Sequence, residues 1–220
     1  MSPSLARTLL VLTFVTGIVD AVSFLGLGQV FAAMQTGNVI FLGFGVAGTA
    51  AAPVLAPLVA LMAFVAGGGL AASLARHGAL GGARAGLGPA LALEVGLLAV
   101  AALVAASTAV SPGELPAYLA IALLSLAMGL RNTAVRGFGG PNLATTVLNL
   151  TMTALTSPAP LSVASGSDMA QRAAAFAAIL AGAATGALLL KASLTLPLAT
   201  AAAITLAAGL TQLRLRPAAP

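Results

Sequence analysis

Long apolar runs constrain this chain more than any other feature of its sequence. A helix needs about 20 predominantly apolar residues to cross a bilayer. Six runs reach about that length, over approximately residues 5–25, 54–75, 89–110, 116–135, 170–190 and 193–210. Their apolar residues are continuous and do not alternate with polar ones, as they would in the strands of a membrane barrel. The pattern therefore predicts an all-α membrane protein with about six transmembrane helices.

Composition supports one integral membrane domain over residues 1–220, with the lipid bilayer as its surroundings. Hydrophobic residues make up 60% and charged residues 6% of the chain, too few charges for the surface of a soluble domain of this length. The net charge of +5 does not indicate a nucleic-acid partner, because most cations lie between or beside the apolar runs. Arg7 precedes an apolar core, as in a signal peptide, but that core continues past Asp20. We expect an uncleaved first span.

Two further apolar stretches, residues 28–48 and 140–158, are interrupted by glycine and polar residues. The first follows Gly26-Leu27-Gly28 and contains Gln35-Thr36-Gly37-Asn38. If both stretches cross the membrane, the chain has eight spans. If both enter and leave on one side, it has six spans and two broken or re-entrant elements.

The distribution of cations favours six spans. With the N-terminus inside, the six-span arrangement puts only Lys191 outside, whereas the eight-span arrangement puts five of the nine cations outside. The eight cations at or near the inner face are then Arg7, Arg76, Arg84, Arg131, Arg136, Arg172, Arg214 and Arg216. This predicts a multi-pass protein of the bacterial cytoplasmic (inner) membrane, with the N- and C-termini both cytoplasmic.

The second half of the chain echoes the first. Gly129-Leu130-Arg131-Asn132-Thr133-Ala134 resembles Gly17-Ile18-Val19-Asp20-Ala21, and Asn149-Leu150-Thr151 takes the place of Thr36-Gly37-Asn38. The repeats cover residues 5–110 and 116–212. Each repeat holds three spans, an odd number, so we expect the second copy to be inverted relative to the first.

These motifs resemble those of the YoaK-like family of bacterial membrane proteins, a domain family of unknown function. The first half carries Gly17-Ile18-Val19-Asp20-Ala21-Val22-Ser23-Phe24-Leu25, then Phe31, Met34 and Thr36-Gly37-Asn38. The second carries Ala127-Met128-Gly129-Leu130-Arg131-Asn132 and Thr145-Thr146-Val147-Leu148. The resemblance covers nearly the whole chain. It departs at Asn149-Leu150-Thr151, where the family tends to have a Thr-Gly pair, and it implies no particular activity.

The breaks are the expected binding site. Backbone groups freed at a break must be buried in protein or line a wet cavity. Helix ends at such a cavity attract polar or anionic atoms. The candidate substrate-binding residues are Asp20, Gln35, Thr36, Gly37, Asn38, Asn132, Asn149 and Thr151. The alternative for these side chains is hydrogen bonding from helix to helix.

Carboxylates within spans are expensive and are candidates for proton or ion sites. Asp20 lies in the outer part of the first span and Glu94 in the inner part of the third, and both are proton-coupling candidates. Arg131 is expected to act as a topology anchor near the inner end of the fourth span. The alternative is that it leans into the cavity.

We therefore expect a membrane transporter or channel-like protein for a small polar or anionic solute, with proton coupling through Asp20 as an option. The alternative is a non-transporting membrane sensor or scaffold, and the sequence leaves a homo-oligomer open. We expect no enzyme, metal or cofactor, because the chain has no cysteine and His77 is its one histidine. A carboxylate enzyme using Asp20 and Glu94 stays as the remaining catalytic reading.

Overall fold

The computed structural model describes residues 3–49, 54–78, 87–137 and 166–214. Within these ranges the chain is all-helical and contains no strand, which confirms the all-α part of the predicted fold class. A π-helical segment, η1 (Ser23–Gly28), continues the first helix. The seven α-helices are α1 (Pro3–Val22), α2 (Gln35–Val46), α3 (Leu55–Arg76), α5 (Gly88–Ser107), α6 (Leu115–Gly137), α8 (Gly166–Leu190) and α9 (Thr195–Arg214).

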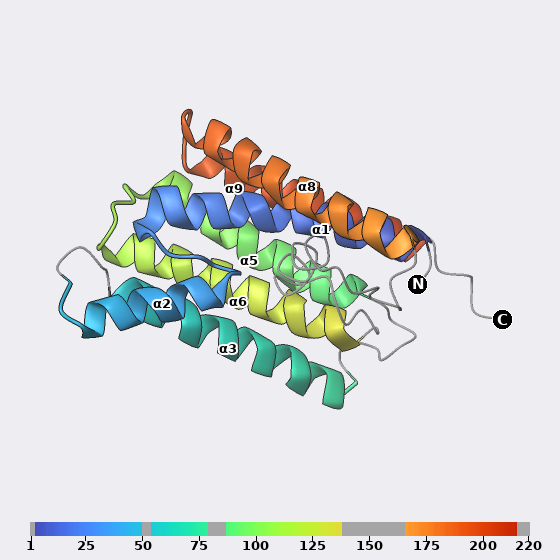
Figure 1. Cartoon of the computed structure of the whole chain (residues 1–220), viewed down its shortest axis with the longest axis horizontal. Coiled ribbons are helices and arrows are strands. Elements are labelled where there is room, and N and C mark those ends of the chain that lie inside the picture. Colours follow the sequence, from blue (N-terminus) through green and yellow to red (C-terminus); the bar gives the residue numbers. More distant parts are fainter. Residues whose placement is uncertain (1–2, 50–53, 79–86, 138–165, 215–220) are drawn as a thin grey trace, which may run out of the picture.

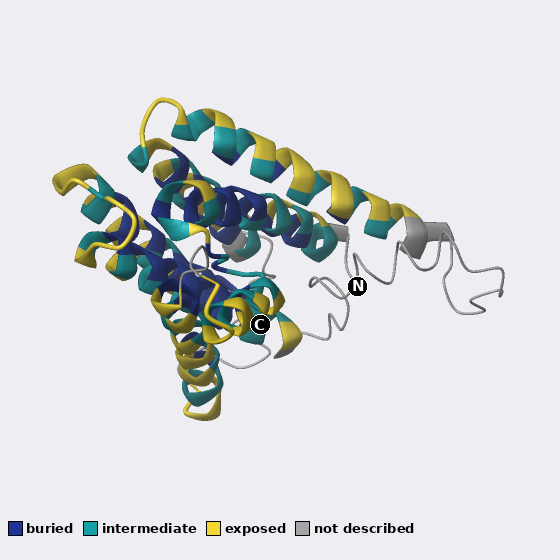
Figure 2. Ribbon diagram, turned by 60° about the vertical axis from the view of Figure 1, so that its left-hand side comes forward, coloured by how far each residue is buried: buried dark blue, intermediate teal, exposed yellow. Residues whose placement is uncertain are grey.

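In the described part of the chain, six helices are long and apolar enough to cross a membrane, as the sequence predicts. They cover Ser4–Gly28, Leu55–Arg76, Gly88–Ser107, Leu115–Arg136, Ala170–Leu190 and Thr195–Gln212. They form an antiparallel bundle in which the start of α1 and the end of α9 lie at the same end (Figure 1). Buried residues fill the middle of the bundle, and exposed residues face outward (Figure 2). Because many outward residues are large and apolar, such as Met62, Val65 and Leu103, these faces suit contact with lipid.

Glycines set the two closest helix crossings. Helix α1 packs on α8, where Gly17 faces the backbone around Ile179 and Gly182 faces the carbonyl of Phe14. Helix α3 packs on α6 in the same manner, through Gly67 and Gly129. A side chain at any of these four positions would collide with the backbone of the partner helix. Close backbone approach of this kind is how helices associate within a membrane.

The run Gly67-Gly68-Gly69 supplies a matched test of this packing. A Cβ at Gly67 would meet the carbonyl oxygen of Leu126, whereas a Cβ at Gly69 has no described atom within 4 Å. We expect Gly67→Ala to lower the free energy of unfolding by about 1–3 kcal/mol. Gly69→Ala should raise it by up to about 1 kcal/mol, since alanine is the better helix former. Denaturation of both variants in detergent checks this, and equal effects would contradict it.

The chain reverses direction at the end of η1. Gly28 has a φ of 140° and Gln29, the one described residue other than glycine with a positive φ, has a φ of 56°. The amide of Gln29 donates to the carbonyl of Phe24 at 3.1 Å, which closes the turn. Residues 29–34 then run back along the first span, because the amide of Ala32 meets Ser23 and the amide of Ala33 meets Asp20.

Helix α2 therefore begins inside the bundle. Asp20 lies eight residues before Gly28, or roughly 12 Å at 1.5 Å per helical residue. From this depth α2 runs for 12 residues along α3, and its C-terminal end lies at the same end of the bundle as the end of η1 (Figure 1). With about 18 Å of length, α2 is too short to cross a bilayer alone. The matching stretch in the second half, residues 140–158, lies outside the described residues.

Candidate functional site

Three ionisable side chains are buried in the described part of the chain, and we call them the charged trio: Asp20, Glu94 and Arg131. Their exposed fractions are 7%, 0% and 7%. Each comes from a different span, α1, α5 or α6. Charges inside membrane spans are costly and, where they occur, mark ion or proton pathways. The trio is therefore the strongest candidate for a functional centre.

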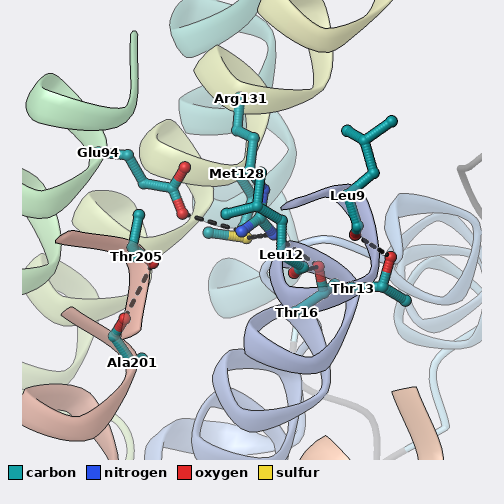
Figure 3. Close-up of polar contacts among 9 residues, drawn as sticks. All are labelled: Leu9, Leu12, Thr13, Thr16, Glu94, Met128, Arg131, Ala201 and Thr205. Atoms are coloured by element: carbon teal, nitrogen blue, oxygen red, sulfur yellow. Dashed lines mark hydrogen bonds and ion pairs between the residues drawn. The ribbon is translucent and has the colours of Figure 1, made fainter. Parts of the chain in front are cut away.

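Arg131 links three helices through its guanidinium group (Figure 3). Its Nη1 forms an ion pair with Oε1 of Glu94 at 2.9 Å. Its Nη2 donates to Oγ1 of Thr16 at 2.5 Å and contacts the sulfur of Met128 at 3.0 Å. The Thr16 hydroxyl in turn donates to the carbonyl of Leu12 at 2.9 Å. The guanidinium thereby ties α6 to α5 and α1 in the middle of the bundle.

This placement corrects the expectation that Arg131 anchors the topology at the inner face. Its side chain turns into the bundle because Glu94 and Thr16 offer oxygen acceptors there, which the bilayer does not. Without Arg131, seven cations count toward the inner face and Lys191 toward the outer. The positive-inside preference for six spans survives this change.

Only one of the two carboxylate oxygens of Glu94 has a hydrogen-bond partner among the described residues. Its Oε1 accepts from Arg131, but its fully buried Oε2 has no hydrogen-bond partner among the described residues. An ionised carboxylate oxygen left bare in a low-dielectric interior is strongly unfavourable. Among the described residues, the ion pair with Arg131 is therefore what compensates a charge on Glu94.

Within the charged trio, Asp20 is the member that contacts the chain leading into α2. Its Oδ1 accepts a hydrogen bond from the amide of Ala33 at 2.8 Å, at the point where the returning chain approaches α2. The next amide back, that of Ala32, donates to the hydroxyl of Ser23 at 3.2 Å. Asp20 also lies one helical turn beyond Thr16, the residue that Arg131 contacts. A change of charge at Asp20 is thus felt directly by the loop that starts α2.

Asn38 and Gln35 close the other side of this loop. Asn38 is fully buried; its Oδ1 accepts from the amide of Phe31 at 2.9 Å, and its Nδ2 donates to the carbonyl of Phe31 at 2.6 Å. The same Nδ2 donates to Oε1 of Gln35 at 2.8 Å. Gln35 donates to the carbonyl of Ala32 at 2.9 Å. Both amides satisfy backbone groups that the break would otherwise leave bare.

Packing against Phe31 explains the glycine at position 37, and the sequence did not reveal this contact. A Cβ at this position would lie 2.7 Å from the ring of Phe31, so the glycine makes room for that ring. Phe31 stacks on Phe24 and Phe41, with ring centroids 4.9 and 6.1 Å away. Thr36, the preceding residue of α2, is exposed. The aromatic stack holds the start of α2 against η1.

The structure thus places five of the eight candidate binding residues, Asp20 and 35–38, in one region at the start of α2. Asn132 is half-buried and follows Arg131 on α6. Asn149 and Thr151 lie outside the described residues. Solute binding by these residues stays a prediction. In the described part of the chain, no three His, Cys, Asp or Glu side chains gather as metal ligands would.

Sequence reasoning missed Thr16 and Phe31 as partners of the site. A signal for Thr16 existed, because a threonine one turn before an intramembrane aspartate lies on the same helix face. Phe31 belongs to the family motif named above, but nothing in that motif indicates that its backbone pairs with Asn38.

Comparison with known proteins places residues 8–211 within the model of the family described as "Protein of unknown function (DUF1275)". The "UPF0700 transmembrane protein YoaK" of Bacillus subtilis (strain 168) is 35% identical over 155 residues. This match covers 68% of the chain and 65% of that relative, so the chain spans a little under two thirds of its length. No solved structure matches.

Proposed function

This chain belongs to the DUF1275 family, as the resemblance predicted, and we propose that it is a transporter for a small polar or anionic solute, coupled to protons through the charged trio. The observation that carries the proposal is the ion pair between Arg131 and Glu94, fully inside a six-span bundle and beside a helix that begins at the depth of Asp20. Buried ionisable groups beside an interrupted helix are the usual components of transporter sites.

We further propose that residues 29–46 are a re-entrant element within an inverted repeat. The helix packing supports this. If α1, α3 and α5 correspond to α6, α8 and α9, then the contact of α1 with α8 corresponds to that of α6 with α3, and the contact of α1 with α9 to that of α6 with α5. The glycines at these crossings follow the same correspondence. Gly17 of α1 corresponds to Gly129 of α6, and Gly67 of α3 corresponds to Gly182 of α8. The α5–α9 contact then lies on the pseudo-two-fold axis.

The proposed orientation has both termini in the cytoplasm of a bacterial cell, and it predicts a labelling pattern. The chain has no cysteine, so His77→Cys and Glu114→Cys each introduce one thiol. Both positions are exposed; His77 follows the inner end of α3, and Glu114 precedes the outer end of α6. An impermeant thiol reagent should label position 114 in intact cells and position 77 only after permeabilisation. Labelling of position 77 in intact cells would overturn the orientation.

Coupling predicts that Asp20→Asn abolishes solute-driven proton movement. Purified protein in liposomes that hold a pH-sensitive dye would be exposed to gradients of small polar and anionic solutes. We expect at least one solute to change the internal pH with the parent protein, and the Asp20→Asn rate to fall to that of empty liposomes. The variant should fold, because the asparagine oxygen still accepts from Ala33.

Glu114→Gln is the matched control, since it removes an exposed carboxylate outside the charged trio and should transport like the parent. Parental proton movement in Asp20→Asn would remove Asp20 from the coupling mechanism. If no solute moves through any protein, yet a solute raises its thermal stability, the transport proposal fails and the sensor or scaffold reading replaces it. The proposal involves no enzymatic step.

A further inference from the structure

The charged trio has one carboxylate too many for its single cation. With all three groups ionised, Asp20 and Glu94 contribute two negative charges and Arg131 one positive charge, leaving a net charge of −1 in the bundle. An uncompensated ion in such an interior is so unfavourable that the group takes up a proton instead.

The surrounding helices offer no second cation among the described residues. Around the trio, α6 contributes Met128 and α1 contributes Thr16, and both contact the guanidinium of Arg131. Helix α9, which packs on α5, contributes the buried hydroxyl of Thr205, which donates to its own helix at Ala201. None of the other cations whose side chains are described is buried; Arg7, Arg76, Arg136 and Lys191 are exposed, and Arg172 is half-buried. A single proton is the simplest compensation.

We infer that the charged trio binds one proton, that this proton rests on Asp20 while Arg131 pairs with Glu94, and that Arg131 is shared between the two carboxylates. The contacts support each part. Glu94 holds the guanidinium at 2.9 Å, as an ionised partner would. The same guanidinium already contacts Thr16, one turn from Asp20 on α1. When Glu94 is neutral, Arg131 can therefore turn to Asp20, and the proton of Asp20 is released.

This inference deepens the proposed proton coupling and rests on it, but it can be tested without transport. Infrared spectroscopy detects the C=O stretch of a protonated carboxylic acid. The chain holds only four acidic side chains, two aspartates and two glutamates, so the spectrum is simple. Isotope-labelled aspartate shifts the band only if an aspartate carries the proton.

We expect one such band in the purified parent at neutral pH, shifted by labelled aspartate. Asp20→Asn should abolish it. Glu94→Gln should abolish it too, although the altered residue is a glutamate, because Arg131 then pairs with Asp20 and ionises it. Arg131→Gln should increase the band, since both carboxylates lose their cation. Glu114→Gln is the control, since Glu114 is exposed, and it should leave the band unchanged.

Each other outcome overturns a part of the inference. No band in the parent means that the trio binds no proton. A band that survives Asp20→Asn puts the proton on another group. A band that Asp20→Asn abolishes but Glu94→Gln preserves means that Arg131 is not shared. If Arg131→Gln does not fold, the two carboxylate variants decide the matter alone. A solute-independent band with this behaviour but no transport would uphold the proton site while rejecting the transport function.

Discussion

Arg131→Met is expected to lower the free energy of unfolding by about 3–5 kcal/mol, the typical effect of removing one partner of a buried ion pair. Methionine keeps most of the length of the side chain but leaves Glu94 without a cation and Thr16 without its donor. The carboxylate must then take up a proton or remain bare, and both are unfavourable at neutral pH. Thermal and denaturant unfolding of detergent-purified protein measures the loss.

The double variant Glu94→Leu/Arg131→Met distinguishes the energy of the ion pair from the cost of leaving one of its charges without a partner. Replacing both charges by apolar groups is often neutral or stabilising, so we expect the double variant to recover most of the loss. A double-mutant cycle with Glu94→Leu alone gives the coupling energy between the two sites. A double variant as unstable as Arg131→Met would show that Arg131 stabilises the bundle by packing and not through Glu94.

The spans and the first break could be predicted from the sequence because the bilayer imposes both. Only long apolar helices cross it, and six runs of the right length are visible in the chain. Gly28 and the polar run from Gln35 to Asn38 indicate the break in the sequence. What these residues do inside the break depends on contacts across the bundle, and the linear pattern does not encode those contacts.

The pairing of Arg131 with Glu94 illustrates the limit. The two residues are 37 positions apart, and Arg131 lies six residues before the end of α6. At that place an arginine can reach the interface or turn inward, and sequence alone does not say which. The packing of α5 against α6 decides it, because that contact brings the carboxylate of Glu94 within reach. Charge balance then makes the inward position the favourable one.

The polar residues of the break illustrate a second limit. Asn38 and Gln35 were predicted to bind solute, and that prediction stays untested. The structure gives both side chains an internal partner in the loop at residues 31–32. A reversal at membrane depth frees amides and carbonyls, and the nearest side chains with matching donors and acceptors satisfy them. The same composition serves a solute site or a self-contained loop, so residue types alone do not separate the two roles.

Asn38→Ala tests which role dominates. It removes the partners of both the amide and the carbonyl of Phe31. Each unsatisfied buried group costs about 1–3 kcal/mol, and Phe31 is half-buried, so we expect the free energy of unfolding to fall by about 2–4 kcal/mol. Loss of the loop should also free Gly37 from the ring of Phe31 and loosen the start of α2. Unfolding in detergent gives the stability, and proteolysis between residues 29 and 37 reports the loosening.

Thr36→Val is the matched control, two residues away on the same helix. Its side chain is exposed, so the stability should change by no more than about 0.5 kcal/mol. If Asn38→Ala is as stable as Thr36→Val yet no longer supports solute-driven proton movement, Asn38 acts on the solute directly. If Asn38→Ala is destabilised while the protein that remains folded still transports, the side-chain amide of Asn38 serves to hold the loop at Phe31 in place. The depth of α2 in the bundle is then set by Asn38 and Asp20 together, one from each side of the loop.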